Sequence, residues 1–236
     1  MKLLDKVIIL TGASDGIGKA LALRLAKENC QLALIGRDQA RLDALLPLIK
    51  EAGSEKVKVY SCDITDTVQL QKAVDQIKRD FPSGPNILIN NAGIWHKMMD
   101  TEDLDPSVID QVIQTNLTSH IHLTRMILPG LKKAKEAAIL NVVSKSGVTA
   151  QKGQSVYSAS KWGMKGFTEV LKTDLKDTNI RVAGVYQSGT NTEMFRKAGD
   201  TFSTDSLTPP EDLAEVITFM LSRPKKIWLH EIHVQY

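Results

Sequence analysis

Three residues, Ser144, Tyr157 and Lys161, have types and spacing that indicate acid/base chemistry. Tyr157 and Lys161 are four residues apart in a stretch predicted to be helical, so their side chains share one face of the helix. A phenol with a pKa of about 10 is a poor base at neutral pH, but a nearby ammonium favours the phenolate and makes it a usable general acid/base. Ser144 ends a predicted strand, where its hydroxyl can polarise a carbonyl oxygen. Taken alone, the Tyr–Lys pair is also typical of an amphipathic surface helix.

A glycine-rich segment, Thr11–Gly18, follows the first predicted strand and opens the first predicted helix. Gly12 permits a tight turn, Gly16 lets the backbone approach a pyrophosphate, and Gly18 allows the helix to pack closely on the sheet. The helix N-terminus adds free N–H groups that bind phosphate. A plain glycine-rich turn is the alternative, but the position of the segment at the start of an α/β chain favours a dinucleotide site.

The end of the second predicted strand indicates which dinucleotide binds. An NAD site commonly carries an acidic residue here, which accepts hydrogen bonds from the ribose 2′-hydroxyl. This chain has Gly36 at that position and Arg37 directly after it. A guanidinium binds a 2′-phosphate through paired, charge-assisted hydrogen bonds. The pattern therefore favours NADP(H) over NAD(H), unless Arg37 is a solvated surface arginine whose charge Asp38 offsets.

Short apolar runs alternate with longer helical patterns along the chain, and this alternation predicts the elements that position the site. Continuously apolar runs such as Val7–Leu10 are typical of strands covered on both faces. We expect an α/β fold, with a doubly wound Rossmann-type parallel sheet of about seven strands and helices on both faces. The predicted strands are Lys6–Leu10, Gln31–Ile35, Lys56–Ser61, Asn86–Ile89, Ala137–Val143, Ile180–Tyr186 and Trp228–Gln235. The predicted helices are Ile17–Glu28, Gln39–Glu51, Asp66–Asp80, Asp105–Lys133, Ser155–Asp177 and Pro210–Leu221.

No linker, repeat or low-complexity segment divides the sequence. Residues 1–236 are therefore expected to form a single dinucleotide-binding catalytic domain. The longest stretch without a clear pattern is Gln187–Thr208, between the sixth predicted strand and the last predicted helix. Because a long irregular segment in a compact fold is more often functional than accidental, we expect a substrate loop at residues 187–208.

Two further motifs make the chain resemble a known family. Asn90–Gly93 (NNAG) directly follows the fourth predicted strand, and Tyr157–Lys161 (YSASK) lies on the predicted helix further on. With the opening TGxxxGIG, these motifs resemble those of the short-chain dehydrogenase/reductase family, and in particular a compact bacterial-type branch that prefers NADP. The resemblance runs from Leu3 to about Pro224. It implies an oxidoreductase that transfers a hydride between NADP(H) and a carbonyl or secondary alcohol substrate, with Tyr157 as general acid/base.

The resemblance also implies roles for individual residues. It adds Asn116 to Ser144, Tyr157 and Lys161 as a fourth catalytic residue, one that interrupts a helix and holds a water linking the lysine to solvent. Lys161 in such enzymes also binds the nicotinamide ribose. No metal is implied, and Asn91 is interpreted as structural. The implied cofactor-binding residues are Gly12, Ser14, Asp15, Gly16, Ile17, Gly18, Arg37, Asp63, Ile64, Asn90, Ala92, Gly93, Tyr157, Lys161, Thr190 and Thr192.

The sequence departs from the family after the sixth predicted strand, where Gln187 and Ser188 replace the usual Pro-Gly. Losing proline frees φ and losing glycine removes an easy route to positive φ, although Gly189 can take over the turn. Two interpretations are open: a tolerated shift of the loop, or a changed nicotinamide pocket with slow chemistry. The second leaves room for an alternative function, a catalytically weak NADP(H)-binding sensor or regulatory protein on the same fold.

The substrate pocket is expected at the carboxyl ends of the strands, where open α/β sheets bind their ligands. Candidate wall residues come from the turn after Gly93, from the neighbourhood of Ser144 and from the irregular segment. They are Trp95, His96, Ser146, Gln151 and Met194. Trp95 and Met194 indicate an apolar wall, although an aromatic residue that fills the core looks the same in a sequence.

The composition limits the possible partners. A net charge of +3, without any basic-aromatic stripe, argues against nucleic-acid binding. The N-terminal apolar run is too short for a membrane span, and Cys30 and Cys62 show neither metal-like nor disulfide spacing, so we expect a cytoplasmic protein. The expected partner is a small-molecule carbonyl or alcohol. By resemblance, the chain pairs through its long helices as a homodimer or homotetramer, with Trp162 and Phe167 as candidate interface residues.

Overall fold

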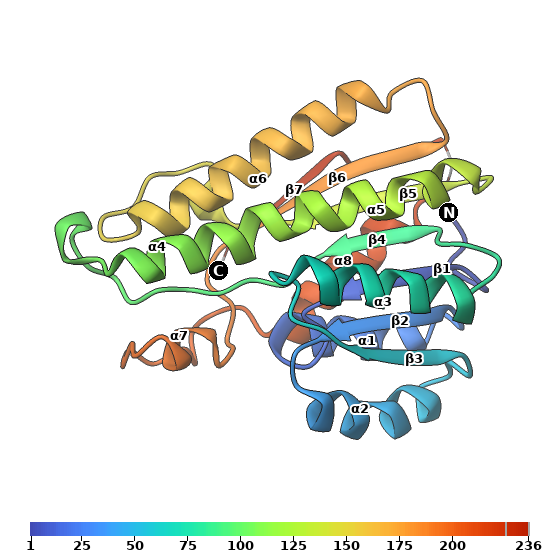
Figure 1. Ribbon diagram of the computed structural model, residues 1–236, viewed down its shortest axis with the longest axis horizontal. Helices are drawn as coiled ribbons and strands as arrows, with labels where there is room; N and C mark the ends of the chain where they lie inside the picture. Colours follow the sequence, from blue (N-terminus) through green and yellow to red (C-terminus); the bar gives the residue numbers. More distant parts are fainter. Residues whose placement is uncertain (225, 236) are drawn as a thin grey trace.

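A computed structural model describes residues 1–224 and 226–235 and shows a seven-stranded parallel sheet (Figure 1). The strands are β1 (Val7–Thr11), β2 (Gln31–Gly36), β3 (Val57–Ser61), β4 (Ile87–Asn90), β5 (Ala137–Val142), β6 (Ile180–Gln187) and β7 (Glu231–Val234). Their order is β3-β2-β1-β4-β5-β6-β7, and each neighbouring pair is parallel. The order changes direction between β1 and β4, so the loops after these strands diverge and open the crevice in which such sheets bind ligands.

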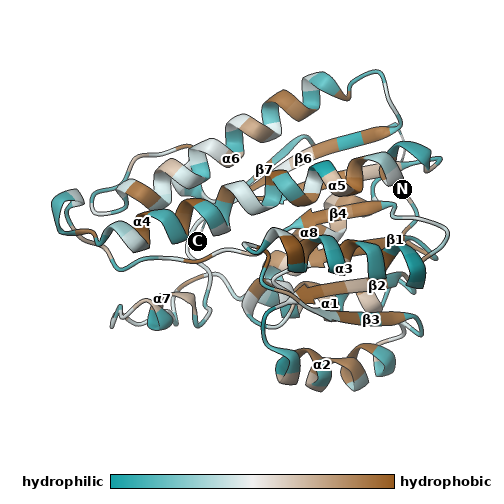
Figure 2. Ribbon diagram, viewed as in Figure 1, coloured by the Kyte–Doolittle hydropathy of each residue, from teal (hydrophilic) through white to brown (hydrophobic). Residues whose placement is uncertain are grey.

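Helices cover both faces of the sheet. They are α1 (Gly16–Ala26), α2 (Gln39–Glu51), α3 (Thr67–Asp80), α4 (Pro106–Ile113), α5 (Ser119–Lys133), α6 (Ser155–Asp174), α7 (Met194–Lys197) and α8 (Pro210–Ser222). One buried cluster joins α1, α2 and α8 to the sheet, and another joins α3, α5 and α6. In β1, Ile8 and Leu10 enter the first cluster and Val7 and Ile9 the second, as the period of a strand requires. Figure 2 shows the strands hydrophobic along most of their length. The doubly wound Rossmann-type prediction is confirmed.

Aspartate side chains fix where several helices begin. Asp38 accepts a hydrogen bond from the backbone N–H of Arg41 at 3.0 Å. Asp66 accepts from the N–H groups of Val68 and Gln69 at 2.9 and 3.0 Å. These bonds satisfy N–H groups that the first turn of a helix leaves free. The helices α2 and α3 therefore begin at, or one residue after, the predicted positions.

Two predicted elements differ from the structure. The helix predicted over residues 105–133 is divided by a π-helical segment, Gln114–Thr118, between α4 and α5. The apolar spacing continues through this segment, so the sequence pattern does not reveal it. The strand predicted over residues 228–235 is only the four residues of β7, because the Trp228 indole donates to the Val182 carbonyl oxygen (3.0 Å) before the ladder begins at Glu231. Residues 225 and 236, the latter the end of the predicted domain, lie outside the described residues.

Apolar side chains are exposed on the outward faces of α5 and α6. Ile121 is 38% exposed, Trp162 47% and Val170 58%. Phe167, the other candidate interface residue, packs against the buried clusters of its own chain. Within residues 1–224 and 226–235, no helix combines the length and apolar character needed to cross a bilayer.

Candidate active site

Glycines shape the loop between β1 and α1. Gly12 has a φ of +67°, and a Cβ there would lie 2.8 Å from the Cα of Ala92. A Cβ on Gly18 would collide with the carbonyl oxygen of Gly12 and lie 2.8 Å from Nδ2 of Asn91. Asn91 anchors the loop by donating from Nδ2 to the carbonyl oxygen of Thr11 at 2.8 Å. A larger residue at position 12 or 18 would therefore displace the loop after β4.

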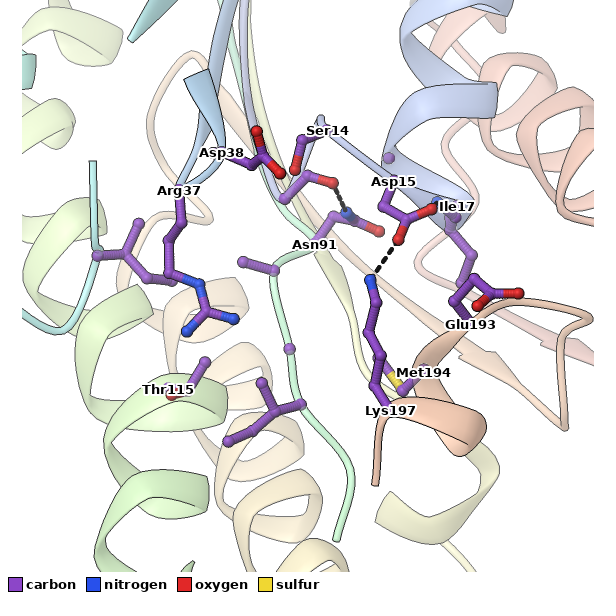
Figure 3. Close-up of a pocket in the computed structure, with 18 of the residues that line it drawn as sticks. Ser14, Asp15, Ile17, Arg37, Asp38, Asn91, Thr115, Glu193, Met194 and Lys197 are labelled. Atoms are coloured by element: carbon purple, nitrogen blue, oxygen red, sulfur yellow. Dashed lines mark hydrogen bonds and ion pairs between the residues drawn. The ribbon is translucent and has the colours of Figure 1, made fainter. Parts of the chain in front are cut away.

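This loop borders a cavity of about 550 Å³ at the crevice between β1 and β4 (Figure 3). The volume lies within the range of small-molecule and cofactor sites. The loops after β1, β2, β3 and β4 line it, together with the segment around α7. The predicted cofactor residues at the cavity are Gly12, Ser14, Asp15, Gly16, Ile17, Gly18, Arg37, Asp63, Ile64, Ala92, Gly93 and Thr192. The structure thus brings most of the predicted cofactor residues to one cavity.

Charged side chains line the part of the cavity nearest β2. The Arg41 guanidinium pairs with Asp15 at 2.9 Å and with Asp38 at 3.2 Å. Lys197 of α7 pairs with Asp15 from the other side (Figure 3). Partial burial acts to raise the pKa of Asp15, but hydrogen bonds from Lys197 and from the backbone N–H at the start of α1 outweigh it and lower the pKa. Arg37 also lines the cavity and, among the described residues, has no carboxylate partner.

The side chains of Ser144, Tyr157 and Lys161 converge. Tyr157 and Lys161 lie on α6, with Nζ of the lysine 5.6 Å from the centroid of the tyrosine ring. The Ser144 hydroxyl lies near enough to Tyr157 to lower the pKa of the phenol slightly. Ser144 itself has a φ of 155°, a backbone conformation that residues other than glycine rarely adopt and that concentrates at functional sites. Tyr157 is 6% exposed and Lys161 5%, so this group is shielded from water.

Burial changes the proton affinity of both α6 side chains. It raises the pKa of Tyr157 to about 12, against the smaller lowering effect of the nearby Ser144 side chain. It lowers the pKa of Lys161 to about 8. Desolvation of the phenol therefore outweighs the attraction of the Lys161 ammonium, and the phenolate favoured by that ammonium together with an oxidised nicotinamide stays a prediction. Both groups are therefore displaced toward their neutral forms.

Asn116 lies in the π-helical segment, as its predicted interruption of the helix requires. Its Oδ1 accepts from the N–H of Ile94 at 2.8 Å, and its Nδ2 donates to the Ile94 carbonyl oxygen at 2.9 Å and to the Ser160 hydroxyl at 3.2 Å. A Cβ on Gly93 would lie 3.4 Å from Oδ1 of Asn116 and 3.7 Å from Nζ of Lys161. Asn116 therefore positions the turn beside Lys161, and its role in holding a water stays a prediction.

Trp95 and Met194, two of the predicted substrate residues, line the cavity. The indole of Trp95 also packs edge-on against the Tyr157 ring, with centroids 4.6 Å apart. His96 is buried, and its Nε2 accepts a hydrogen bond from the backbone N–H of Tyr157 at 3.3 Å. Of the two residues predicted to form an apolar wall, Trp95 therefore contacts both the cavity and Tyr157, whereas Met194 lines the cavity.

Ser146 and Gln151, like His96, are predicted substrate residues that are absent from the cavity lining among the described residues. The Ser146 hydroxyl donates to Oε1 of Gln154 at 2.8 Å, and Nε2 of Gln154 donates to Oε1 of Gln151 at 2.7 Å. These bonds connect the loop after β5 to the start of α6. The structure therefore gives both residues a supporting position rather than one at the cavity wall.

Asn90 and Thr190, two predicted cofactor residues, have side chains buried outside the cavity. Nδ2 of Asn90 donates to Asn141 at 2.8 Å and to Thr124 at 3.1 Å, which ties β4 to β5 and α5. Thr190 forms a backbone bridge with Thr208, and its buried hydroxyl has no partner among the described residues. The part of these two residues in binding the cofactor therefore stays a prediction.

Arg41 and Lys197 line the cavity without having been expected there. Arg41 lies in the first turn of α2, close after Arg37 in the sequence, and this nearness is the signal that indicates a second guanidinium at the same loop. Lys197 reaches Asp15 across 182 residues of sequence. No local pattern predicts a contact of that kind.

The sequence matches the family model described as short chain dehydrogenase over residues 6–202. It is 33% identical over 236 residues to a 3-oxoacyl-(acyl-carrier-protein) reductase of Thermotoga maritima, a match covering 94% of this chain and 92% of that protein. The structure resembles that of a 3-ketoacyl-(acyl-carrier-protein) reductase of Brucella melitensis complexed with NADH, with a TM-score of 0.87, 29% identity and coverage of 99% and 98%. An Escherichia coli structure described as a short chain dehydrogenase complexed with NADPH gives a TM-score of 0.87 at 25% identity, with the same coverage.

Proposed function

Because the chain belongs to the short-chain dehydrogenase family, we propose that it is an NADP(H)-dependent oxidoreductase that interconverts a carbonyl and a secondary alcohol. One observation carries this proposal: Ser144, Tyr157 and Lys161 converge behind a cavity whose shape depends on glycine. A buried phenol, hydroxyl and amine at a small-molecule cavity form a group suited to proton transfer.

The residues at the cavity fit a dinucleotide. Gly12 and Gly18 keep open a hollow that Cβ atoms would fill, and the N-terminus of α1 lies at its edge, where a pyrophosphate is favoured. Asp63 and Ile64 line the same cavity after β3 and Thr192 lies near α7. When bound, a reduced nicotinamide supplies a hydride to the substrate carbon.

Each residue of the converging group has a distinct part in carbonyl reduction. Tyr157 donates its phenolic proton to the carbonyl oxygen, and the Ser144 hydroxyl donates a hydrogen bond to the same oxygen. The Lys161 ammonium, 5.6 Å from the tyrosine ring centroid, stabilises the phenolate that remains. Asn116 keeps the adjoining turn in place through its two hydrogen bonds to Ile94.

The preference for NADP(H) rests on the residues after β2. Gly36 stands where an acidic residue would bind a ribose 2′-hydroxyl, and Arg37 lines the cavity without a carboxylate partner among the described residues. Arg41 adds a second guanidinium, although its pairs with Asp15 and Asp38 already occupy it. A free guanidinium next to the expected 2′ position supports binding of a phosphate there.

We extend the proposal to the organisation of the chain. Residues 1–236 act as a single catalytic domain in the cytoplasm, with residues 187–208 as the substrate loop and Trp95 and Met194 as parts of the substrate wall. The exposed Ile121, Trp162 and Val170 on α5 and α6 support pairing of these helices in a homodimer or homotetramer. Light scattering coupled to size exclusion tests the oligomeric state.

One observation favours a second function, that of a catalytically weak NADP(H)-binding sensor. Gln187 and Ser188 replace Pro-Gly, and the side-chain oxygens Oε1 of Gln187 and Oγ of Ser188 are buried without a hydrogen-bond partner among the described residues. Unpaired buried polar atoms at the end of β6 are costly. Two such costly atoms beside the expected nicotinamide site support a pocket adapted to something other than fast turnover.

The deciding experiment measures NADPH and NADH oxidation against a broad panel of carbonyls, with Tyr157→Phe as the test variant. Tyr60→Phe is a matched control, because the Tyr60 hydroxyl donates to Asp80 (2.8 Å) away from the cavity. We expect NADPH to be preferred, and the Tyr157 variant to lose about a hundredfold or more of the rate while the control retains it. Binding of either cofactor without turnover in either direction would instead favour the sensor.

A further inference from the structure

The Tyr157 ring is separated from the cavity by Trp95. Among the described residues, the cavity lining includes Trp95 but neither Tyr157 nor Ser144. The indole lies edge-on to the phenol ring at 4.6 Å, and Tyr157 is left only 6% exposed. A molecule that enters through the cavity therefore meets Trp95 before it meets Tyr157.

The position of Trp95 depends on the segment that begins with α7. Its indole Nε1 donates to Oδ2 of Asp200 at 2.6 Å, and its ring packs against Phe195 with centroids 5.4 Å apart. The ring of the neighbouring His96 stacks on the indole, with centroids 5.9 Å apart and an interplanar angle of 11°. His96 is itself tied to α6, because its Nε2 accepts from the N–H of Tyr157. The indole of Trp95 is thus held by the His96 ring, which is tied to α6, and by Phe195 and Asp200.

The bond to Asp200 is the polar contact that sets the orientation of the indole. Tryptophan has a single N–H donor, and a hydrogen bond to a carboxylate is among the stronger kinds. The Asp200 carboxylate has Trp95 as its one hydrogen-bond donor in the part of the chain that the structure describes. Three residues earlier, Lys197 pairs with Asp15 of the glycine-rich loop (Figure 3). The same short segment therefore links the cofactor end of the cavity to the cover over Tyr157.

We propose that Asp200 is a positioning residue that holds Trp95 over Tyr157, and that this hydrogen bond must open before a substrate reaches the phenol. The proposal rests on the proposed function in one respect, the role of Tyr157 as the proton donor. When most molecules have Trp95 bonded to Asp200, only the remaining fraction, in which this bond is broken, can bind substrate. The apparent affinity for substrate is reduced in proportion to that fraction. Breaking the bond then increases that fraction and lowers KM.

Fluorine NMR of protein labelled with 5-fluorotryptophan tests the contact without requiring activity. The three tryptophans give three signals, and the signal missing from Trp95→Phe belongs to Trp95. We expect Asp200→Ala to shift that signal. Asp205→Ala is the matched control, since Asp205 is a carboxylate in the same segment that accepts from Ser203 (2.9 Å), and it should leave the signal in place. An unmoved Trp95 signal in Asp200→Ala overturns the proposal.

Steady-state kinetics tests the consequence. We expect Asp200→Ala and Trp95→Phe each to lower KM for the carbonyl about tenfold, with the effect on KM rather than kcat. The double variant should show no further decrease, because both changes remove one bond. Asp200→Asn, which keeps an acceptor oxygen, should lie between wild type and Asp200→Ala. An unchanged or increased KM in Asp200→Ala overturns the proposal. If wild-type protein reduces no carbonyl, the proposed function fails, and the fluorine signal alone decides whether Asp200 holds Trp95.

Discussion

Replacement of Lys161 by methionine should stabilise the folded protein while abolishing its activity. Lys161 is 5% exposed, and its pKa falls from 10.5 to about 8 because burial disfavours the ammonium. A lysine displaced in this direction binds its proton less tightly in the folded state than in the unfolded state. At neutral pH the folded protein therefore holds a charge that burial penalises.

The magnitude follows from the pKa difference. A displacement from 10.5 to about 8 corresponds to about 3 kcal/mol at pH 7, where both states are protonated. The replacement by methionine also removes the hydrogen bond from Lys161 to the Val142 carbonyl oxygen (3.3 Å). Losing this bond cancels about 1 kcal/mol of the gain in unfolding free energy. The expected gain in unfolding free energy is about 2 kcal/mol at pH 7.

The pH dependence has a definite sign. Between the folded pKa of about 8 and the unfolded value of 10.5, the unfolded state binds more protons, so the stability of the wild type rises with pH. The advantage of the methionine variant should therefore shrink to about 1 kcal/mol at pH 9. Denaturant unfolding at both pH values measures it, with Lys176→Met, at an exposed lysine just after α6, as the control. A variant no more stable than wild type at pH 7, or a gain that does not shrink, refutes the reasoning.

Three further predictions concern the cofactor, the end of β6 and the direction of reaction. Arg37→Gln should raise KM for NADPH about tenfold to a hundredfold and leave KM for NADH nearly unchanged, because it removes charge-assisted bonds to a 2′-phosphate; equal effects on both cofactors would contradict the assignment. Replacing Gln187 and Ser188 by Pro-Gly should raise the unfolding free energy by about 1 kcal/mol or more, since two buried unpaired oxygens are removed. A large gain in turnover in the same variant would show that the nicotinamide pocket is altered. Alcohol oxidation should accelerate about tenfold per pH unit between about pH 6 and 8, as the phenolate of Tyr157 becomes more abundant, whereas a flat profile of initial rates would contradict this.

The fold was predictable because its signals are local and repeated. Continuously apolar runs such as Val7–Leu10 identify strands covered on both faces, and each is followed by a helix with regular apolar spacing. The π-helical segment Gln114–Thr118 could not be predicted from the sequence, because one extra residue in a turn leaves the apolar pattern nearly intact. The predicted strand began at Trp228, three residues before β7 does. The reason is a tertiary contact, the hydrogen bond from the Trp228 indole to the carbonyl oxygen of Val182.

The site was predictable where one motif carries one function. The glycine-rich loop and the Tyr157–Lys161 pair lie where their spacing places them. What the sequence does not encode locally is contact between distant segments, such as that of Asp200 with Trp95. Burial is equally non-local: residues packed around α6 desolvate Tyr157 and Lys161 and so shift the pKa of each toward its neutral form.

Burial also biases the direction of the chemistry. With a pKa of about 12, Tyr157 is protonated at neutral pH, which is the form that carbonyl reduction requires. Oxidation must begin from the phenolate, and reaching it at pH 7 from a pKa near 12 costs about 7 kcal/mol. The pKa of Lys161, about 8, leaves it mostly an ammonium at pH 7, but the pKa of Tyr157 beside it is still raised by burial. The positive charge of an oxidised nicotinamide is then the main remaining source of stabilisation, and it is present only in the oxidative direction. We therefore expect carbonyl reduction to be faster than alcohol oxidation at neutral pH.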